Sequence, residues 1–177
     1  RDNFESIFKH DHLRVTIKSE NDKRYFITYN DPRRFGFIDL FHKKEINEHF
    51  LLKKLGVEPF EKNFNVGYLQ SMFDKKIKCI KDTLMDQSVI AGIGNIYASE
   101  ILFKAKVNPF RSAKTLNNEE IKSIIGATME ILKKSINVGG TTLQNHLQPN
   151  GKLGYFSQKL EVYGKKDKSC NKCKCLI

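Results

Sequence analysis

Four short stretches carry residues whose types and spacing could do chemistry. The first is "VIAGIGNIYASE", in which Gly92-Ile-Gly94-Asn95 precedes a helical pattern. Glycines let the backbone approach a ligand closely, and the free N–H groups at a helix start attract phosphate. The stretch lacks both the Gly-Lys-Ser/Thr of a Walker loop and the strand and third glycine of a dinucleotide fingerprint. Taken alone, it predicts either a phosphate site or a tight turn between two helices.

The second stretch, "DKKIKCIKD", surrounds two isoleucines with four lysines: Lys75, Lys76, Lys78 and Lys81. Such lysines commonly form no more than a solvated helix face. Because they lie in the same helical region as the glycine turn, a role in binding phosphate is the alternative.

The third stretch is "NDPRRFGF", which follows an alternating run. Proline after Asp31 predicts a turn, and adjacent residues of an extended chain point to opposite faces. Phe35 is therefore expected on the same face as Arg33. A ring beside a cation suits a wedge that enters a base stack. The alternative is a core phenylalanine between two surface arginines.

The fourth stretch is "VYGKKDKSCNKCKCLI", in which Cys170-x2-Cys173 is half of a four-cysteine zinc ribbon. Three of the four cysteines lie in the last eight residues, with Cys175 as the third. This crowding favours metal ligation in a reducing compartment over a disulfide framework. Two or three thiolates cannot close a tetrahedral site, so we expect this chain to bind zinc weakly or not at all.

Strands and then helices must position these stretches. Leu13, Val15 and Ile17 alternate with polar residues, "SENDK" has the composition of a turn, and "RYFITY" and "FGFIDLF" follow, which predicts a β-meander. From about Lys43 the period lengthens, and "KKEINEHFLLKKLG" and "VGYLQSMFDKKIKCIKDTLM" fit short amphipathic helices.

The clearest predicted helix runs from about Asn118 to Asn137. Asn117 and Glu120 could form a capping box before it, and Gly139 stands where a C-terminal stop belongs. Its apolar stripe is expected in the core and consists of Ile121, Ile124, Ile125, Met129, Leu132 and Ile136.

Charge narrows the class of partner. With 31 Lys and Arg against 20 Asp and Glu, the 177-residue chain has a formal charge of +11 and should attract polyanions, nucleic acid above all. The length allows one core or two small ones. No apolar run approaches the roughly 20 residues of a membrane helix, and "RDNFESIFKHDH" lacks a signal-peptide core. We therefore expect a soluble, cytoplasmic protein.

Taken in order, the motifs "KHDH", "DPRRFG", "LMDQ", "AGIGNIYASEILF", "GGTTL", "GKLGYF", "VYG" and "CNKC" closely resemble those of the bacterial formamidopyrimidine-DNA glycosylases, relatives of endonuclease eight. The resemblance covers nearly the whole chain, and "DPRRFG" and "GIGNIYASE" are its most specific parts. It implies an α+β fold with partial β-sandwich strands, a helix–two-turn–helix domain and a truncated zinc ribbon. The implied segments are 1–42 (sandwich strands), 43–140 (helix–two-turn–helix), 141–164 (lesion-recognition loop and following segment) and 165–177 (half ribbon).

The resemblance also implies a function in base excision repair. Similar proteins remove oxidised purines such as 8-oxoguanine and formamidopyrimidine, and then cut the backbone by β,δ-elimination through a Schiff base. The implied partner is damaged double-stranded DNA in the bacterial cytoplasm, bound by a monomer that holds one zinc ion.

Site residues carry over position by position. Arg33 and Phe35 would fill the space left by an everted nucleotide, and Asn95 would bind phosphate at the start of a helix. Cys170 and Cys173 would be zinc ligands, and residues 148–159 would form the loop over the extruded base. The residues implied to contact DNA are His10, Arg33, Phe35, Lys76 and Asn95.

The sequence also departs from the family pattern. The family's amino-terminal proline nucleophile, its glutamate acid/base and a later lysine and methionine match no residue here, and Arg1 has no matching surroundings. The second zinc pair is also unmatched, and Cys175 stands where the family has a glycine or another small residue. Because every remaining motif is intact, we expect a fragment of a longer enzyme, inactive by itself. The alternative is a non-catalytic nucleic-acid-binding protein with a helix–two-turn–helix unit.

Overall fold

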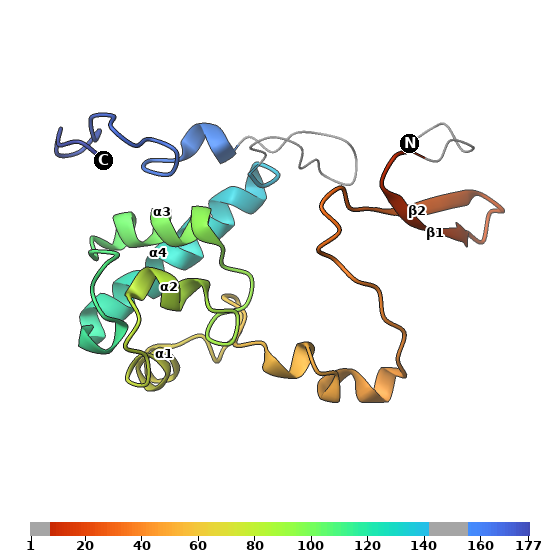
Figure 1. Ribbon diagram of the computed structural model, residues 1–177, viewed down its shortest axis with the longest axis horizontal. Helices are drawn as coiled ribbons and strands as arrows, with labels where there is room; N and C mark the ends of the chain where they lie inside the picture. Colours follow the sequence, from red (N-terminus) through yellow and green to blue (C-terminus); the bar gives the residue numbers. More distant parts are fainter. Residues whose placement is uncertain (1–7, 142–155) are drawn as a thin grey trace. The chain divides into compact units, whose positions relative to one another are not determined.

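The computed structural model describes residues 8–141 and 156–177, and the chain divides into two compact units (Figure 1). The first unit is Arg1–Ile46 and the second is Asn47–Ile177. Residues 148–155 of the predicted recognition loop lie outside the described residues. Within the described ranges, no helix is both long enough and apolar enough to cross a membrane.

The first unit is built on a two-stranded antiparallel hairpin, β1 (Asp11–Lys18) and β2 (Arg24–Asn30). Val15 pairs with Ile27 at its centre. Because side chains alternate across a strand, one face of the hairpin is apolar throughout. Its members are Leu13, Val15, Ile17, Tyr25, Ile27 and Tyr29.

The predicted third strand of the meander is wrong, because residues 35–41 contain no strand. The backbone N–H groups of Arg33, Arg34 and Gly36 are bonded to the Asp31 carboxylate and not to a neighbouring strand. Arg34 also takes a positive φ of 55°, which turns the chain away from extended geometry.

The second unit is helical, and its described residues form four α-helices: α1 (Val66–Phe73), α2 (Ile80–Met85), α3 (Asn95–Ala105) and α4 (Asn118–Asn137). The 3-10 turns Ala113–Thr115 and Phe156–Lys159 also belong to this unit. The amphipathic helix predicted from Lys43 is wrong, because that stretch forms the 3-10 segments Lys43–Glu48 and Leu52–Lys54. Neither segment buries a residue, so no core face stabilises a longer helix there.

Local capping explains where α4 begins and ends. The Asn117 side chain accepts the Glu120 N–H, and the Glu120 carboxylate accepts the Asn117 N–H, which confirms the predicted capping box. At the other end, Gly139 has a φ of 79°. Its N–H bonds the Ile136 carbonyl, and the next N–H bonds the Ser135 carbonyl, so the helix ends in a Schellman motif.

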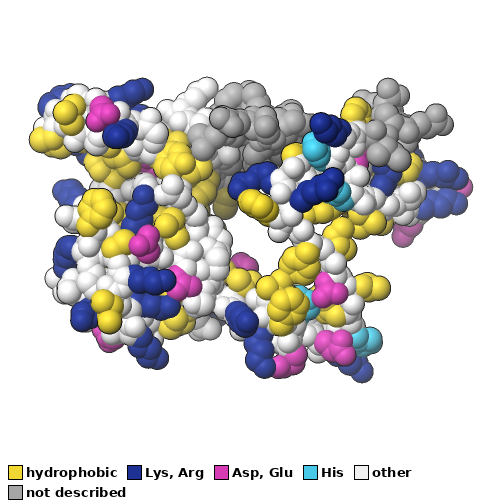
Figure 2. All heavy atoms as spheres, viewed as in Figure 1, with side chains coloured by type: hydrophobic (Ala, Val, Ile, Leu, Met, Phe, Trp, Pro, Cys, Tyr) yellow, Lys and Arg dark blue, Asp and Glu magenta, His cyan; other side chains and the backbone are white. Residues whose placement is uncertain are grey.

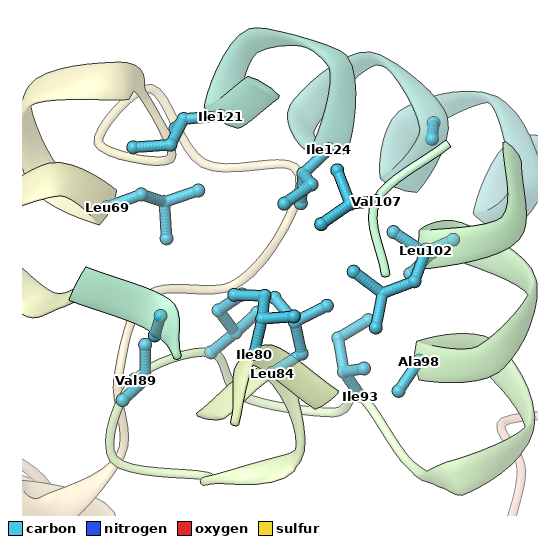
Figure 3. Packing of buried hydrophobic residues seen from close by; sticks show 14 of the residues in the cluster. Leu69, Ile80, Leu84, Val89, Ile93, Ala98, Leu102, Val107, Ile121 and Ile124 are labelled. Carbon is cyan, nitrogen blue, oxygen red and sulfur yellow. The ribbon is translucent and has the colours of Figure 1, made fainter. Parts of the chain in front are cut away.

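The core of the second unit lies among the four helices (Figure 3). Leu69, Ile80, Leu84, Ile93, Ala98, Leu102, Val107, Ile121 and Ile124 meet there. The predicted α4 stripe is correct at Ile121 and Ile124 but wrong at Ile136, whose side chain is 64% exposed. The buried face instead continues through Ile131 to Ser135.

Candidate nucleic-acid interface

Within residues 8–141 and 156–177, the first N–H groups of α3 have no hydrogen-bond partner. Gly94 is the N-cap of α3 and provides no side-chain cap, and Asn95 follows as the first helical residue. Gly92, with a φ of 85°, precedes them in a conformation that favours glycine. Gly92, Gly94 and Asn95 are all exposed. The first N–H groups of a helix without a cap, at the positive end of its dipole, can bind an anion such as phosphate.

A glutamine braces this glycine turn from inside. The Nε2 of Gln87 donates to the carbonyl oxygens of Met85 at 3.1 Å and Ile93 at 2.9 Å, and its Oε1 accepts the Gly92 N–H at 2.8 Å. Sequence reasoning missed Gln87. It belongs to the "LMDQ" motif, but a glutamine five residues before a glycine has no local signal of its own.

Lys76 lies beside the segment that leads to the turn. Its ammonium contacts the Asp86 carboxylate at 2.7 Å, and the two side chains are 27% and 28% exposed. Asp86 also accepts the backbone N–H of Ser88 at 3.0 Å and its hydroxyl at 2.6 Å. The hydrogen bond from Lys76 and then those from Ser88 lower the pKa of Asp86 to about 2. An ammonium has three donors, so this ion pair leaves Lys76 further donors for a phosphate.

The first unit contains a turn organised by a single carboxylate. The Oδ1 of Asp31 accepts the N–H groups of Arg33 at 3.1 Å and Arg34 at 3.0 Å. Its Oδ2 accepts the Gly36 N–H at 2.8 Å and the Tyr29 hydroxyl at 3.0 Å. The Gly36 N–H, the Tyr29 hydroxyl and the two arginine N–H groups lower the pKa of Asp31. The turn is therefore held in one shape by polar contacts.

That shape places an arginine over an aromatic ring. The Arg33 guanidinium lies 4.6 Å from the centre of the Phe35 ring, so the two side chains meet as predicted. They meet across a turn with Arg34 at a φ of 55°, and not through the alternation of an extended chain. Phe35 is 78% exposed, so the alternative of a core phenylalanine is wrong for the described structure. The pair therefore presents two stacked planar groups at the surface, the cationic guanidinium of Arg33 and the apolar ring of Phe35.

His10 lies beside the same turn. Its carbonyl accepts the Asp31 N–H at 3.1 Å, and its φ of 76° bends the chain at the start of β1. The ring of His12 also contacts the Asp31 carbonyl, at 2.9 Å. The fold therefore brings His10, which is distant in the sequence, next to the turn that carries Arg33 and Phe35.

The predicted metal-binding cysteines form a tight knuckle. The Cys170 thiol accepts the Lys172 N–H at 3.4 Å, and the Cys170 carbonyl accepts the Lys174 N–H at 3.0 Å. The N–H groups of Cys173 and Lys172 lower the pKa of the Cys170 thiol, which favours the thiolate that a metal needs. Cys175 lies against the same knuckle: its thiol donates to the Cys173 carbonyl at 3.7 Å, and its carbonyl accepts the Cys170 N–H at 2.8 Å. In the part of the chain that is described, no three His, Cys, Asp or Glu side chains are grouped to hold a metal.

A buried glutamate attaches the C-terminal segment to α3. Glu100 is only 5% exposed, and its carboxylate accepts three consecutive backbone N–H groups. These come from Glu161 at 2.8 Å and from Val162 and Tyr163 at 2.9 Å each. Sequence reasoning quoted this glutamate within "NIYASE" but assigned it no role. The helix that begins at the glycine turn thus also holds the segment that leads to the cysteine knuckle.

Both units carry lysines and arginines on their surfaces, interspersed with fewer acidic side chains (Figure 2). In the second unit, a tight glycine turn leads into an uncapped helix on a four-helix core, which defines a helix–two-turn–helix module. The model of the formamidopyrimidine-DNA glycosylase H2TH domain matches residues 55–146, half of the chain. The chain belongs to the formamidopyrimidine-DNA glycosylase family.

Similar proteins extend this match to both units. A formamidopyrimidine-DNA glycosylase of Zymomonas mobilis is 44% identical over 168 residues, which are 95% of this chain and 61% of that protein. One of Bartonella quintana is 42% identical over 171 residues, 93% of this chain and 59% of that protein. The chain therefore spans about three fifths of the length of these curated relatives.

Solved structures agree with the sequence match. The crystal structure of MutM (Fpg) from Thermus thermophilus matches with a TM-score of 0.83 and 33% identity. The match covers 97% of this chain and 63% of the Thermus chain. The Lactococcus lactis Fpg in complex with abasic-site DNA has a TM-score of 0.82 and 32% identity, with 97% and 61% covered. These matches confirm the predicted α+β fold class.

Proposed function

We propose that this chain is the DNA-binding part of a base-excision-repair glycosylase and AP lyase that acts on oxidised purines in double-stranded DNA. The observation that carries the proposal is the uncapped, exposed start of α3 at Gly94 and Asn95 in a chain of this family. The Lactococcus lactis neighbours support the substrate class, since they are complexes with Fapy-dG DNA and with abasic-site DNA. The alternative is a nucleic-acid-binding protein without catalysis.

Phosphate binding belongs to the second unit in this proposal. Asn95 and the first N–H groups of α3 bind one phosphate, and Lys76 binds another while Asp86 restrains its side chain. Because these contacts go to the backbone, they add affinity for damaged and undamaged duplex alike.

Recognition of an everted nucleotide belongs to the first unit. Flipping a base costs a few kcal/mol of lost stacking and pairing, and inserted side chains restore part of this. The stacked pair of Arg33 and Phe35 is already formed and exposed, so little conformational entropy is lost when it enters the gap. His10 lies next to their turn and contacts the nearby backbone of the DNA.

The bond-breaking chemistry is assigned to the family's amino-terminal proline. Its secondary amine attacks the sugar C1′ and loses its proton, and the damaged base leaves with the electrons of the glycosidic bond. The C1′–O4′ bond then opens, O4′ takes up a proton, and the nitrogen lone pair forms the iminium. Loss of a C2′ proton and then of a C4′ proton expels the 3′- and then the 5′-phosphate. No residue of the sequence above matches that proline or its glutamate partner. We therefore expect residues 1–177 to bind DNA without cutting it.

Zinc belongs to the complete family ribbon. The knuckle geometry and the lowered pKa of the Cys170 thiol fit Cys170 as one ligand of a structural zinc ion. Cys173 would be the second ligand, although the hydrogen bond from the Cys175 N–H is outweighed by the Cys170 and Cys175 side chains, which raise the pKa of its thiol. We expect the purified chain to hold much less than one tightly bound zinc per molecule. Stoichiometric zinc that survives dialysis against a mild chelator would contradict this.

The proposal is tested by fluorescence anisotropy on short duplexes, undamaged or with a stable abasic analogue. Asn95→Ala and Lys76→Met should each weaken binding to both duplexes by about tenfold, whereas Arg33→Ala should remove the preference for the abasic one. Lys122→Met is the matched control, because Lys122 is an exposed lysine of α4 paired with Glu119. If neither Asn95→Ala nor Lys76→Met exceeds the control, the phosphate assignment is wrong.

Borohydride trapping distinguishes the glycosylase from the non-catalytic nucleic-acid-binding protein. Reduction converts a Schiff base into a stable protein–DNA adduct. Residues 1–177 should give no adduct, because none of them matches the proline nucleophile. An adduct that appears when a family-type Pro-Glu segment precedes Arg1 would support the glycosylase. No abasic preference, together with no adduct after that addition, would favour the non-catalytic binder.

A further inference from the structure

We infer that Gln87 is a positioning residue for the phosphate site, acting through the Gly92–Asn95 turn. The inference rests on the proposed function, because it assumes that Gly94 and Asn95 meet a phosphate. It goes further by stating which side chain holds these two residues in a binding orientation.

The geometry of a peptide group carries the first step. The carbonyl of Ile93 and the N–H of Gly94 belong to the same peptide group, and in a trans peptide these two bonds point in opposite directions. Gln87 draws the Ile93 carbonyl toward itself with a bond of 2.9 Å. The Gly94 N–H must therefore point away from Gln87. No acceptor for this N–H is found in residues 8–141 and 156–177, so it is available to a ligand.

Hydrogen bonds, and not packing, orient the peptide groups of the turn. A Cβ placed on Gly92 or Gly94 would meet no atom within 4 Å, so the outer side of the turn is open. Ile93 is buried and anchors the turn by packing, but packing of its side chain does not set the orientation of the flanking peptide planes. The three hydrogen bonds of Gln87, to Met85, Gly92 and Ile93, set that orientation.

Gln87 is itself held rigidly, which a positioning residue requires. Its carbonyl accepts the Gly56 N–H at 2.8 Å. A Cβ on Gly56 would collide with the backbone of Val89, so the two chain segments are in close contact. The preceding residue, Asp86, is fixed by Lys76 and Ser88. The bonds from Gln87 therefore connect the glycine turn to a rigid frame.

A double-mutant cycle tests the inference. Gln87→Met keeps the length of the side chain and removes its hydrogen bonds, and Asn95→Ala removes the residue that it is inferred to position. We expect each to weaken binding to undamaged duplex about tenfold. The double variant should be weakened by about 10- to 20-fold and not by the roughly 100-fold of independent effects.

The salt dependence gives a second readout. Gln87 carries no charge, so Gln87→Met should leave the slope of log K against log salt unchanged, whereas Lys76→Met should reduce it by about 1. Gln70→Met is the matched control, since the Gln70 amide donates to Asp74 at the C-cap of α1 and takes no part in the glycine turn. Gln70→Met should change the affinity for DNA by no more than about twofold relative to the unaltered chain.

The outcomes are distinct. A double variant whose affinity for DNA falls about 100-fold, as independent effects predict, would overturn the inference. So would a Gln87→Met variant that binds DNA as tightly as the Gln70→Met control. Either result leaves the role of Asn95 intact. If the unaltered chain did not bind DNA, the proposed function itself would fail. If Gln87→Met did not fold, Gln87→Glu replaces it. One oxygen of that variant still accepts the Gly92 N–H, while the other cannot donate to Ile93, so the same loss of additivity is expected.

Discussion

Replacing Glu100 should destabilise the second unit strongly. Glu100→Ala removes an acceptor that is 5% exposed and receives three N–H groups at 2.8 to 2.9 Å. Hydrogen bonds to a charged group contribute about 1.5–3 kcal/mol each when buried. Because Glu161, Val162 and Tyr163 are only partly buried, water can replace some of the hydrogen bonds that their N–H groups lose. We therefore expect a loss of about 3–5 kcal/mol, which is large against a typical total of roughly 5–15 kcal/mol.

Glu100→Gln should cost less for a defined reason. Oε1 of Glu100 receives two of the N–H groups and Oε2 receives one. The amide oxygen of glutamine can keep the pair from Val162 and Tyr163, while its NH₂ group faces the N–H of Glu161. One bond is lost and the other two lose their charge, so the expected cost is about 1–3 kcal/mol.

Urea unfolding followed by circular dichroism at 222 nm measures these losses, since the chain has no tryptophan to report by fluorescence. Amide exchange by NMR gives the local evidence: protection at residues 161–163 should be lost in Glu100→Ala and retained within α4. Glu61→Gln makes the same charge change at an exposed glutamate and should stay within about 0.5 kcal/mol. A loss below about 1 kcal/mol for Glu100→Ala, or equal losses for alanine and glutamine, would refute the reasoning.

Three further predictions concern other parts of the fold. Gly36→Ala places a methyl carbon 1.9 Å from the Tyr29 hydroxyl oxygen, so it should distort the turn and reduce the preference for abasic duplex in anisotropy. Gly67→Ala should not, because its methyl carbon would make only an ordinary van der Waals contact of 3.5 Å with Asn65. Asn117→Ala removes the α4 cap and should cost about 1 kcal/mol in urea unfolding, and a change below about 0.3 kcal/mol would contradict this. The pKa of Asp86 is lowered to about 2, so its contribution to stability is complete above the ordinary value of 3.8 and is lost as the pH falls toward 2. An acid titration in which Asp86→Asn shows the same steepness as the unaltered chain over that range would contradict the ion pair.

Local signals in the sequence determined several features of this protein. The capping box at Asn117 and Glu120 and the stop at Gly139 predicted the ends of α4, because caps depend on residues three or four positions apart. Alternation predicted β1 and β2. The glycine stretch before Asn95 predicted either a phosphate site or a tight turn between two helices, and a turn with Gly92 at a φ of 85° is present. The motifs "DPRRFG" and "GIGNIYASE" predicted the family, which the comparisons confirm.

The tertiary structure decided the features that depend on distant partners. Glu100 meets amides 61 to 63 residues away, and Gln87 acts on peptide groups whose orientation no residue type encodes. The predicted third strand failed at its start, where the Asp31 carboxylate bonds the Gly36 N–H and the positive φ of Arg34 turns the chain. A residue's type states which bonds its side chain can make. Only the folded chain decides which partner is within reach, because each buried donor or acceptor must be satisfied by whatever group the packing brings near.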